Sequence, residues 1–160
     1  MARLDVVLDR LEADEQAHSL AGPATPEDLA RVESALRHPL PHEFRALLER
    51  FGGGLFYGGH EVFGPLRVMI HDIELVPDLL TTRARLAANA RCLPDYLVPF
   101  HRFGQLFHLL DARRVRHEGA LVLAADASAD YPDLAGFLEA VVVPGGLPIR
   151  LDGGPLAEGT

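Results

Sequence analysis

The chain has 160 residues and a net charge of −8, from 23 acidic and 15 basic side chains, so it is long enough for one globular domain with its own core. The acidic balance opposes non-specific binding to phosphate backbones and anionic lipids, and no nucleic-acid or membrane partner is expected. Every basic residue is arginine, which excludes a P-loop lysine and Schiff-base chemistry, and the single cysteine, Cys92, excludes an internal disulfide.

The N-terminal segment does not look like a targeting sequence. Residues 1–15 carry acidic groups among their apolar positions and lack the uninterrupted apolar core of a secretory signal. No later stretch approaches the ~18 consecutive apolar residues that are needed to cross a bilayer. We therefore expect a cytoplasmic protein.

Two amphipathic helices are predicted first, joined by a connector over residues 18–23. The second has a strong start signal, with Thr25 as N-cap and Pro26 at the first helical position, and it should end before Pro39. Its buried stripe is expected to be Leu29, Val32 and Leu36. The first has apolar residues at i, i+3, i+4 and i+7, which form one buried stripe of Leu4, Val7, Leu8 and Leu11.

The stretch from Leu40 to Gly64 is predicted to form a helix followed by a β-hairpin, around which the rest of the chain is arranged. It begins with a helix that Gly52 can end in the left-handed conformation, and the buried face of this helix is Phe44, Leu47, Leu48 and Phe51. Two aromatic segments follow, joined at Gly58-Gly59, which accepts the positive φ of a tight β-hairpin. Strand alternation places Phe56 and Tyr57 on opposite sides, so one of the two should be accessible.

Residues 66–92 carry a strand signal and a weaker helix signal. Residues 66–70 can add a strand to the sheet, and the more polar residues 71–74 are expected to leave it. Residues 77–92 favour a partly exposed helix or an ordered loop, with a thin apolar stripe of Leu86, Ala87 and Ala90.

The C-terminal part is predicted to complete the sheet and to end in a helix. Three strands are expected over residues 96–103, 105–110 and 120–125, followed by a polar turn at residues 126–130. A helix then runs from Pro132 to Val141 or Val142, with one apolar face of Leu134, Phe137, Leu138 and Val141.

These elements predict an α+β fold with a mainly antiparallel central sheet, flanked by N-terminal helices and a C-terminal helix. Residues 1–143 are expected to form a single domain, in which residues 1–22 are the N-terminal helix and connector. Residues 144–160 lack periodicity and are expected to form an irregular tail on the surface.

A search for reactive groups favours no catalytic, metal or cofactor site. The His-Glu pairs that begin at His42, His60 and His117 each lack the second histidine of an HExxH motif. None of the three serines lies in a Gly-x-Ser-x-Gly elbow. Acidic pairs such as Asp126/Asp130 are in turns, where carboxylates usually accept backbone hydrogen bonds.

In order and spacing, these segments resemble the SUKH superfamily, also called the Smi/Knr-type family, over roughly residues 25 to 142. One departure is Gly104-Gln105, where the family often has a glycine-acid turn. The matching segments are the helix with Leu29, Val32 and Glu33, then Leu40-Pro41, Phe44-Arg45, Phe51-Gly52-Gly53, Val62-Phe63-Gly64, Leu93-Pro94, Leu97-Val98-Pro99-Phe100, Leu110-Asp111 and Phe137-Leu138-Glu139.

The resemblance implies a non-enzymatic domain that binds a protein, as immunity proteins do when they neutralise a bacterial polymorphic toxin. The expected partner is a cognate toxin domain. A regulatory scaffold of the same fold is an alternative, and an enzyme or small-ligand binder would show a deep pocket with converging His, Asp or Arg side chains. The oligomeric state is left open. The residues expected in the protein-binding surface are Tyr57, His60, Glu61, Asp72, Glu74, Asp126 and Asp130.

Overall fold

The computed structural model describes residues 3–89, 93–113, 122–124 and 130–144. These residues form an α+β fold with a mainly antiparallel central sheet, helices before it and a helix after it, as predicted. A 3-10 turn, η1, follows the first helix, and a π-helical turn, η2, follows the last. The helical elements are α1 (Arg3–Ala13), η1 (Glu15–Ala17), α2 (Pro26–Leu36), α3 (His42–Phe51), α4 (Leu79–Asn89), α5 (Leu134–Phe137) and η2 (Leu138–Val142).

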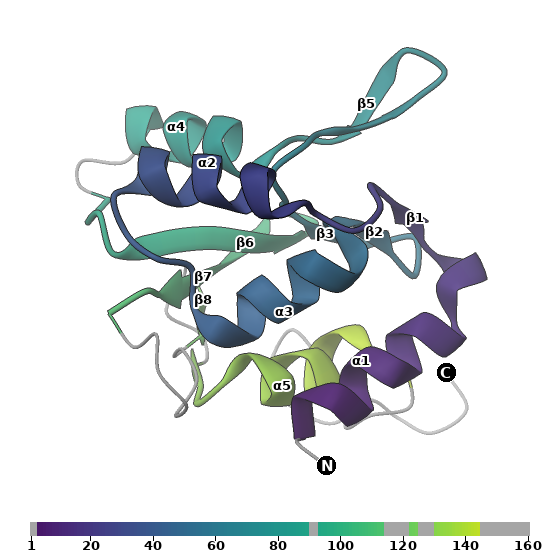
Figure 1. The fold of residues 1–160 in the computed structure, drawn as a ribbon. Helices are drawn as coiled ribbons and strands as arrows, with labels where there is room; N and C mark the ends of the chain where they lie inside the picture. The colour runs from purple at the N-terminus through teal and green to yellow at the C-terminus, as the bar shows by residue number, and fades with distance from the viewer. Residues whose placement is uncertain (1–2, 90–92, 114–121, 125–129, 145–160) are drawn as a thin grey trace.

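Within the described residues, the central sheet has the strand order β1-β2-β3-β6-β7-β8-β9, and every neighbouring pair is antiparallel. A second sheet contains only β4 and β5, which form a hairpin that projects from the body of the molecule (Figure 1). The strands are β1 (Ser19–Leu20), β2 (Gly54–Phe56), β3 (His60–Val62), β4 (Val68–Ile70), β5 (Ile73–Val76), β6 (Leu97–Phe103), β7 (Leu106–Asp111), β8 (Val122–Ala124) and β9 (Asp130–Tyr131).

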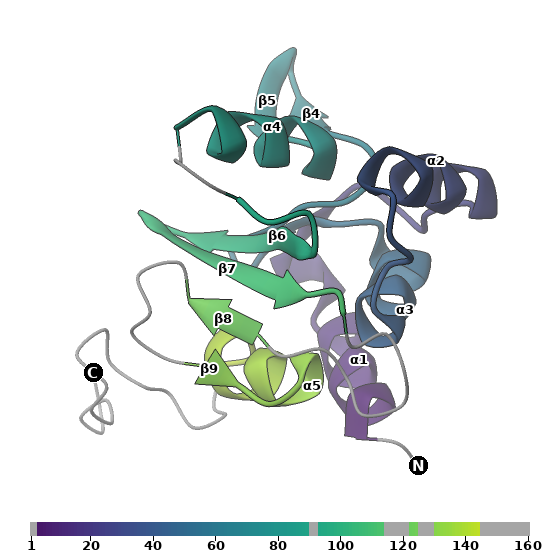
Figure 2. The same ribbon diagram turned by 90° about the vertical axis from the view of Figure 1, so that its left-hand side faces the viewer.

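The core lies between the sheet and the helices α1, α3 and α5. The ring centroid of Phe100 on β6 is 5.8 Å from that of Phe44 on α3 and 5.3 Å from that of Phe137 on α5, and all three side chains are fully buried. Helix α1 packs in turn against α5. Figures 1 and 2 both show α2 and α4 side by side, at the opposite end of the molecule from α1 and α5.

The predicted buried stripes of the first three helices are confirmed. Thr25 and Asp28 form a reciprocal capping box: the Thr25 Oγ1 accepts from the Asp28 amide at 3.1 Å, and the Asp28 carboxylate accepts from the Thr25 amide at 3.4 Å. Gly52 ends α3 with φ +77°, as expected. Pro41 is the N-cap residue of α3.

The β2–β3 hairpin is present, but its turn is one residue earlier than predicted. The positive φ angles belong to Tyr57 (+52°) and Gly58 (+72°), and the Gly59 amide donates to the Phe56 carbonyl at 3.2 Å. The dipeptide Gly58-Gly59 is therefore not the central pair of the turn. Phe56 is fully buried and Tyr57 is partly exposed, so one of the two is accessible, as expected.

Residues 66–76 depart most from the prediction. Residues 68–70 do not extend the central sheet but pair with β5 in a separate sheet. Residues 73 and 74 of β5 belong to the segment 71–74 that was expected to leave the sheet. Residues 19–20, predicted as a connector, form the short strand β1 against β2. Asp130, assigned to a polar turn, begins β9, while residues 126–129 are outside the described residues.

Two helical faces also differ from the prediction. Helix α4 buries Leu79 and Thr82, whereas Ala87 is exposed and Ala90 is outside the described residues. At the last helix the π-helical turn adds a residue per turn, so Val142 rather than Val141 is fully buried. Of the tail predicted over residues 144–160, residues 145–160 are also outside the described residues.

Candidate protein-binding surface

The β4–β5 hairpin carries most of the large apolar side chains that the described residues leave exposed. Met69 is 42% exposed, Ile70 41% and Ile73 69%, and Leu66 at the base of the hairpin is 52% exposed. Only Val6 on α1 and Phe103 on β6 are comparable elsewhere among the described residues. Exposed large apolar side chains that are clustered on one element commonly mark a binding site.

The hairpin contains Asp72 and Glu74, two of the predicted binding residues. His71 and Asp72 form its tip with φ angles of +48° and +63°, a conformation that non-glycine residues adopt only at a cost. Glu74 lies 3.8 Å from the Arg85 guanidinium of α4. Asp72 is exposed, and its carboxylate makes no hydrogen bond or ion pair with the described residues.

Tyr57, His60 and Glu61 lie together at the β2–β3 hairpin, each with a partner within the molecule. The Tyr57 hydroxyl donates to the Asp14 carboxylate at 2.7 Å, and the Tyr57 amide donates to His18 Nδ1 at 3.2 Å. Burial, followed by the hydrogen bond to Asp14, raises the pKa of Tyr57 to about 12. Tyr57 therefore joins the hairpin to the turn after α1.

Glu61 faces the opposite side of the sheet from His60. Its carboxylate pairs with the Arg102 guanidinium at 3.1 Å, and the two residues are cross-strand partners on β3 and β6. Burial raises the pKa of Glu61, and the nearby charge of Arg102 opposes this shift. The Arg102 guanidinium also lies 5.7 Å from the centroid of the Phe107 ring on β7.

His60 begins a row of three histidines across β3, β6 and β7. His60 Nδ1 is 3.0 Å from His101 Nε2, and His101 Nδ1 is 3.1 Å from His108 Nδ1. Both His101 and His108 are buried, and both rings contact Phe137 of α5. Burial lowers the pKa of His60 to about 4 and lowers that of His101, to which the two neighbouring histidines also contribute.

The row is a hydrogen-bonded network rather than a metal site. His101 uses a different nitrogen toward each neighbour, so the three rings do not aim at one point. No group of three or more His, Cys, Asp or Glu in the described part of the chain is placed to hold a metal ion. Three neutral imidazoles satisfy both contacts when each N–H points the same way along the row.

The predicted binding residues do not converge on one site. Asp130 is four strands from Glu61 in the sheet order, which corresponds to about 19 Å at the usual strand spacing. Asp126 is outside the described residues. The structure thus brings together Tyr57, His60 and Glu61 at one hairpin, and Asp72 and Glu74 at another.

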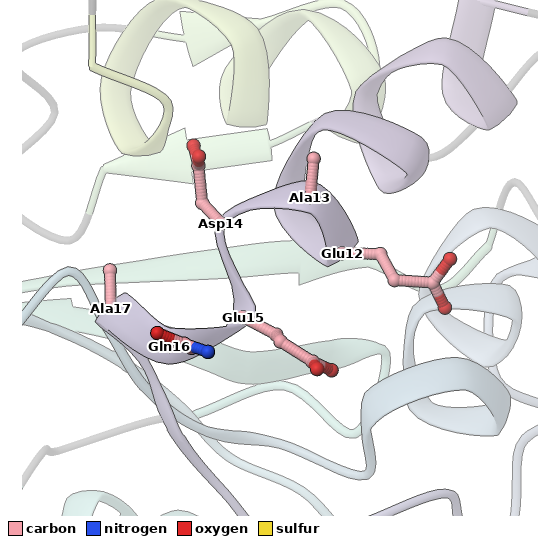
Figure 3. A pocket seen from close by; sticks show the side chains of 6 residues that line it. All are labelled: Glu12, Ala13, Asp14, Glu15, Gln16 and Ala17. Atoms are coloured by element: carbon pink, nitrogen blue, oxygen red, sulfur yellow. The ribbon is translucent and has the colours of Figure 1, made fainter.

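A hollow of about 380 Å³ lies at the turn between α1 and η1. Figure 3 shows that the carboxylates of Glu12, Asp14 and Glu15 point in different directions there. Asp14 accepts from Tyr57 and Arg10, and Glu12 accepts from Arg50 at 2.9 Å, so these groups are already engaged. The described residues that line the hollow are Glu12, Ala13, Asp14, Glu15, Gln16 and Ala17.

Sequence reasoning missed the residues that stand out most in the structure. Met69 and Ile70 were assigned no exposed role because a short apolar run is typical of a core strand. Ile73 lies in the polar segment 71–74 that was expected to leave the sheet, and it was assigned no role in binding. The contact between His101 and His108 could have been predicted from the sequence. A turn at Gly104-Gln105 in the predicted hairpin places these two residues directly opposite each other, as the structure shows.

No helix in the described residues is long and apolar enough to span a bilayer.

Comparison with known proteins identifies a related family and a related fold. A family model described as the SMI1 / KNR4 family (SUKH-1) matches residues 23–139, which include α2 to α5 and every strand after β1. A crystal structure of a protein from Pseudomonas syringae pv. tomato is similar with a TM-score of 0.57 and 17% sequence identity, over 86% of this chain and 97% of that chain. At this identity the likeness concerns the fold alone. None of the curated proteins compared with the chain matches it.

Proposed function

Because the chain belongs to the SMI1 / KNR4 family (SUKH-1), we propose that it is a non-enzymatic, cytoplasmic immunity protein that neutralises a bacterial polymorphic toxin by binding it directly. Membership confirms the resemblance that the sequence predicted. Domains of this family are known in immunity proteins, which bind protein partners. The observation that carries the proposal is the family match over residues 23–139 of the 160.

The surface of the molecule supports protein binding rather than catalysis. The exposed apolar side chains are concentrated on one projecting hairpin, which suits a protein interface. The carboxylates around the hollow after α1 diverge, whereas general acid–base catalysis needs groups that converge on a substrate. The net charge of −8 favours a basic partner, such as a domain that acts on nucleic acid.

Co-expression tests this proposal. The toxin domain encoded beside this chain's gene is expressed in bacteria with and without the chain, and growth is followed together with co-purification of the two proteins. Neutralisation by binding predicts restored growth and a stable complex of defined stoichiometry. Continued toxicity without a complex contradicts the proposal, and a complex that leaves the toxin fully active favours the regulatory scaffold instead.

A catalytically inactive variant of the same toxin domain provides the control. It should bind the chain with the same affinity, because binding that masks a surface does not require turnover of a substrate. If the complex forms only with active toxin, or if the chain chemically alters the toxin, the non-enzymatic mechanism is wrong.

A further inference from the structure

We infer that the β4–β5 hairpin is the anchor of the interface and that it inserts into an apolar cleft of a basic partner domain. This inference rests on the proposed function and adds the surface and the chemistry of the partner. The anchor consists of Met69, Ile70, Asp72 and Ile73.

The base of the hairpin is fixed while its outer part is open. Val68 and Val76 form a cross-strand pair and are only 7% and 1% exposed, and β5 contacts β2 of the central sheet. Every residue from 69 to 74 is exposed, by contrast. Figure 1 shows that the tip extends beyond the helices and the sheet. The hairpin is therefore a protrusion with a firm base, which suits insertion into a concave surface.

The apolar side chains cover both faces of this protrusion. Ile70 and Ile73 are cross-strand partners and share one face, whereas Met69 is paired with Glu74 on the other. A partner that contacts one face only would leave the other in water. A cleft with two walls covers both, and complete burial of each large apolar side chain is worth about tenfold or more in affinity.

Charge selects among the possible occupants of the hairpin surface. A second copy of this chain would bring a charge of −8 against −8, and an anionic membrane would repel it in the same way. At the tip, the exposed carboxylate of Asp72 has no cation among the described residues, whereas Glu74 has Arg85. A basic domain with an arginine or lysine beside its cleft would complement both the net charge of −8 and the exposed carboxylate of Asp72.

Matched variants test the inference by titration calorimetry, with the inactivated neighbouring toxin domain as the probe. Ile70→Ser combined with Ile73→Ser removes one apolar face of the hairpin, and Val6→Ser removes an apolar side chain that is 54% exposed on α1, far from the hairpin in Figure 1. The double variant should raise Kd at least ~100-fold, whereas Val6→Ser should change it less than about twofold. Both variants should melt at the temperature of the wild type, because the replaced side chains are exposed.

Asp72→Asn tests the charge separately from the shape of the turn. Asparagine tolerates the left-handed conformation that residue 72 adopts with φ +63°, so this variant keeps the turn and removes only the charge. It should slow association several-fold at low salt and leave dissociation nearly unchanged. A variant whose association is unaffected would overturn the assignment of a basic cleft.

The remaining outcomes separate the inference from the proposed function. If the wild type binds and the double variant binds equally well, the partner uses another surface and the anchor is wrong, while neutralisation still holds. If the wild type does not bind the toxin domain, both fail. Two results would show a different occupant and overturn the inference. One is that the wild type sediments as a dimer and the double variant as a monomer. The other is that the wild type binds vesicles of phosphatidylcholine and phosphatidylglycerol and the double variant does not.

Discussion

Single residues fix the junction at which α3 meets the sheet. Gly52 has φ +77°, and a Cβ at this position would lie 1.7 Å from the backbone carbonyl oxygen of Gly22. Gly104 has a similar φ of +60°, but a Cβ there would meet nothing within 4 Å. The left-handed conformation was predictable at Gly52 from its place after an amphipathic helix, whereas the close approach of residues 22 and 52 is a tertiary contact without a local signal.

We predict that Gly52→Ala destabilises the protein far more than Gly104→Ala. Both substitutions carry the cost of a left-handed alanine, about 1 kcal/mol, but only the first also forces two backbone segments apart. Gly52→Ala should therefore lose several kcal/mol of unfolding free energy or fail to fold. Urea denaturation followed by circular dichroism measures both values. Equal losses would contradict the steric account.

At the scale of elements, the three-histidine row links β3, β6 and β7 to α5. Burial favours the neutral form of two of these rings, because it lowers the pKa of His60 to about 4 and also lowers that of His101. A group whose pKa is lower in the folded state makes the protein less stable as the pH falls below its unfolded value near 6.5, and for His60 this loss levels off near pH 4. The fold is therefore most stable when His60 and His101 are uncharged.

This arrangement predicts a loss of stability in mild acid. Between pH 7 and pH 5, the unfolding free energy should fall by about 2 kcal/mol through His60, given its pKa of about 4 and 1.36 kcal/mol for each pKa unit. In the His60→Asn variant, whose new side chain does not titrate, the unfolding free energy should fall by about 2 kcal/mol less over the same pH range. Urea midpoints at the two pH values give the comparison, and identical pH dependence in both proteins would refute the role of His60.

A carboxylate of α3 holds the start of α5. Glu43 accepts from the backbone amides of Leu134 at 3.1 Å and Ala135 at 3.2 Å, although it precedes them by about ninety residues. We predict that Glu43→Gln, which cannot accept from both amides equally, costs about 1–2 kcal/mol. Glu49 on the same helix pairs only with Arg45 in the described part of the chain. The control substitution Glu49→Gln should therefore cost less than about 0.5 kcal/mol. Similar losses in thermal or urea unfolding would contradict this role for Glu43.

Elements with strong local patterns were predictable, and those set by tertiary packing were not. The stripes of α1, α2 and α3 follow from their spacing alone. The separation of β4 from the central sheet was not foreseen, because the run Val68 to Ile70 is as apolar as a core strand. Helix α4 buries Leu79 and Thr82, whereas the sequence predicted a buried stripe of Leu86, Ala87 and Ala90.

For the whole molecule, charge and shape act together in the proposed interface. The net charge of −8 should accelerate the encounter with a basic toxin domain, and salt should screen this attraction. We predict that the association rate constant falls about tenfold or more between about 50 and 500 mM salt, while the dissociation rate changes little. Stopped-flow fluorescence measures both rates. An association rate that does not depend on salt would exclude a basic partner.

Amide hydrogen exchange on the complex tests the central claim most directly, because it shows where the partner binds without any substitution. The chain is compared alone and with the inactivated toxin domain, and exchange is followed by mass spectrometry for each segment. Insertion of the hairpin predicts that exchange slows most strongly in residues 66–76, with little change in α1. Unchanged exchange in residues 66–76, with slowing at another surface, would contradict the account.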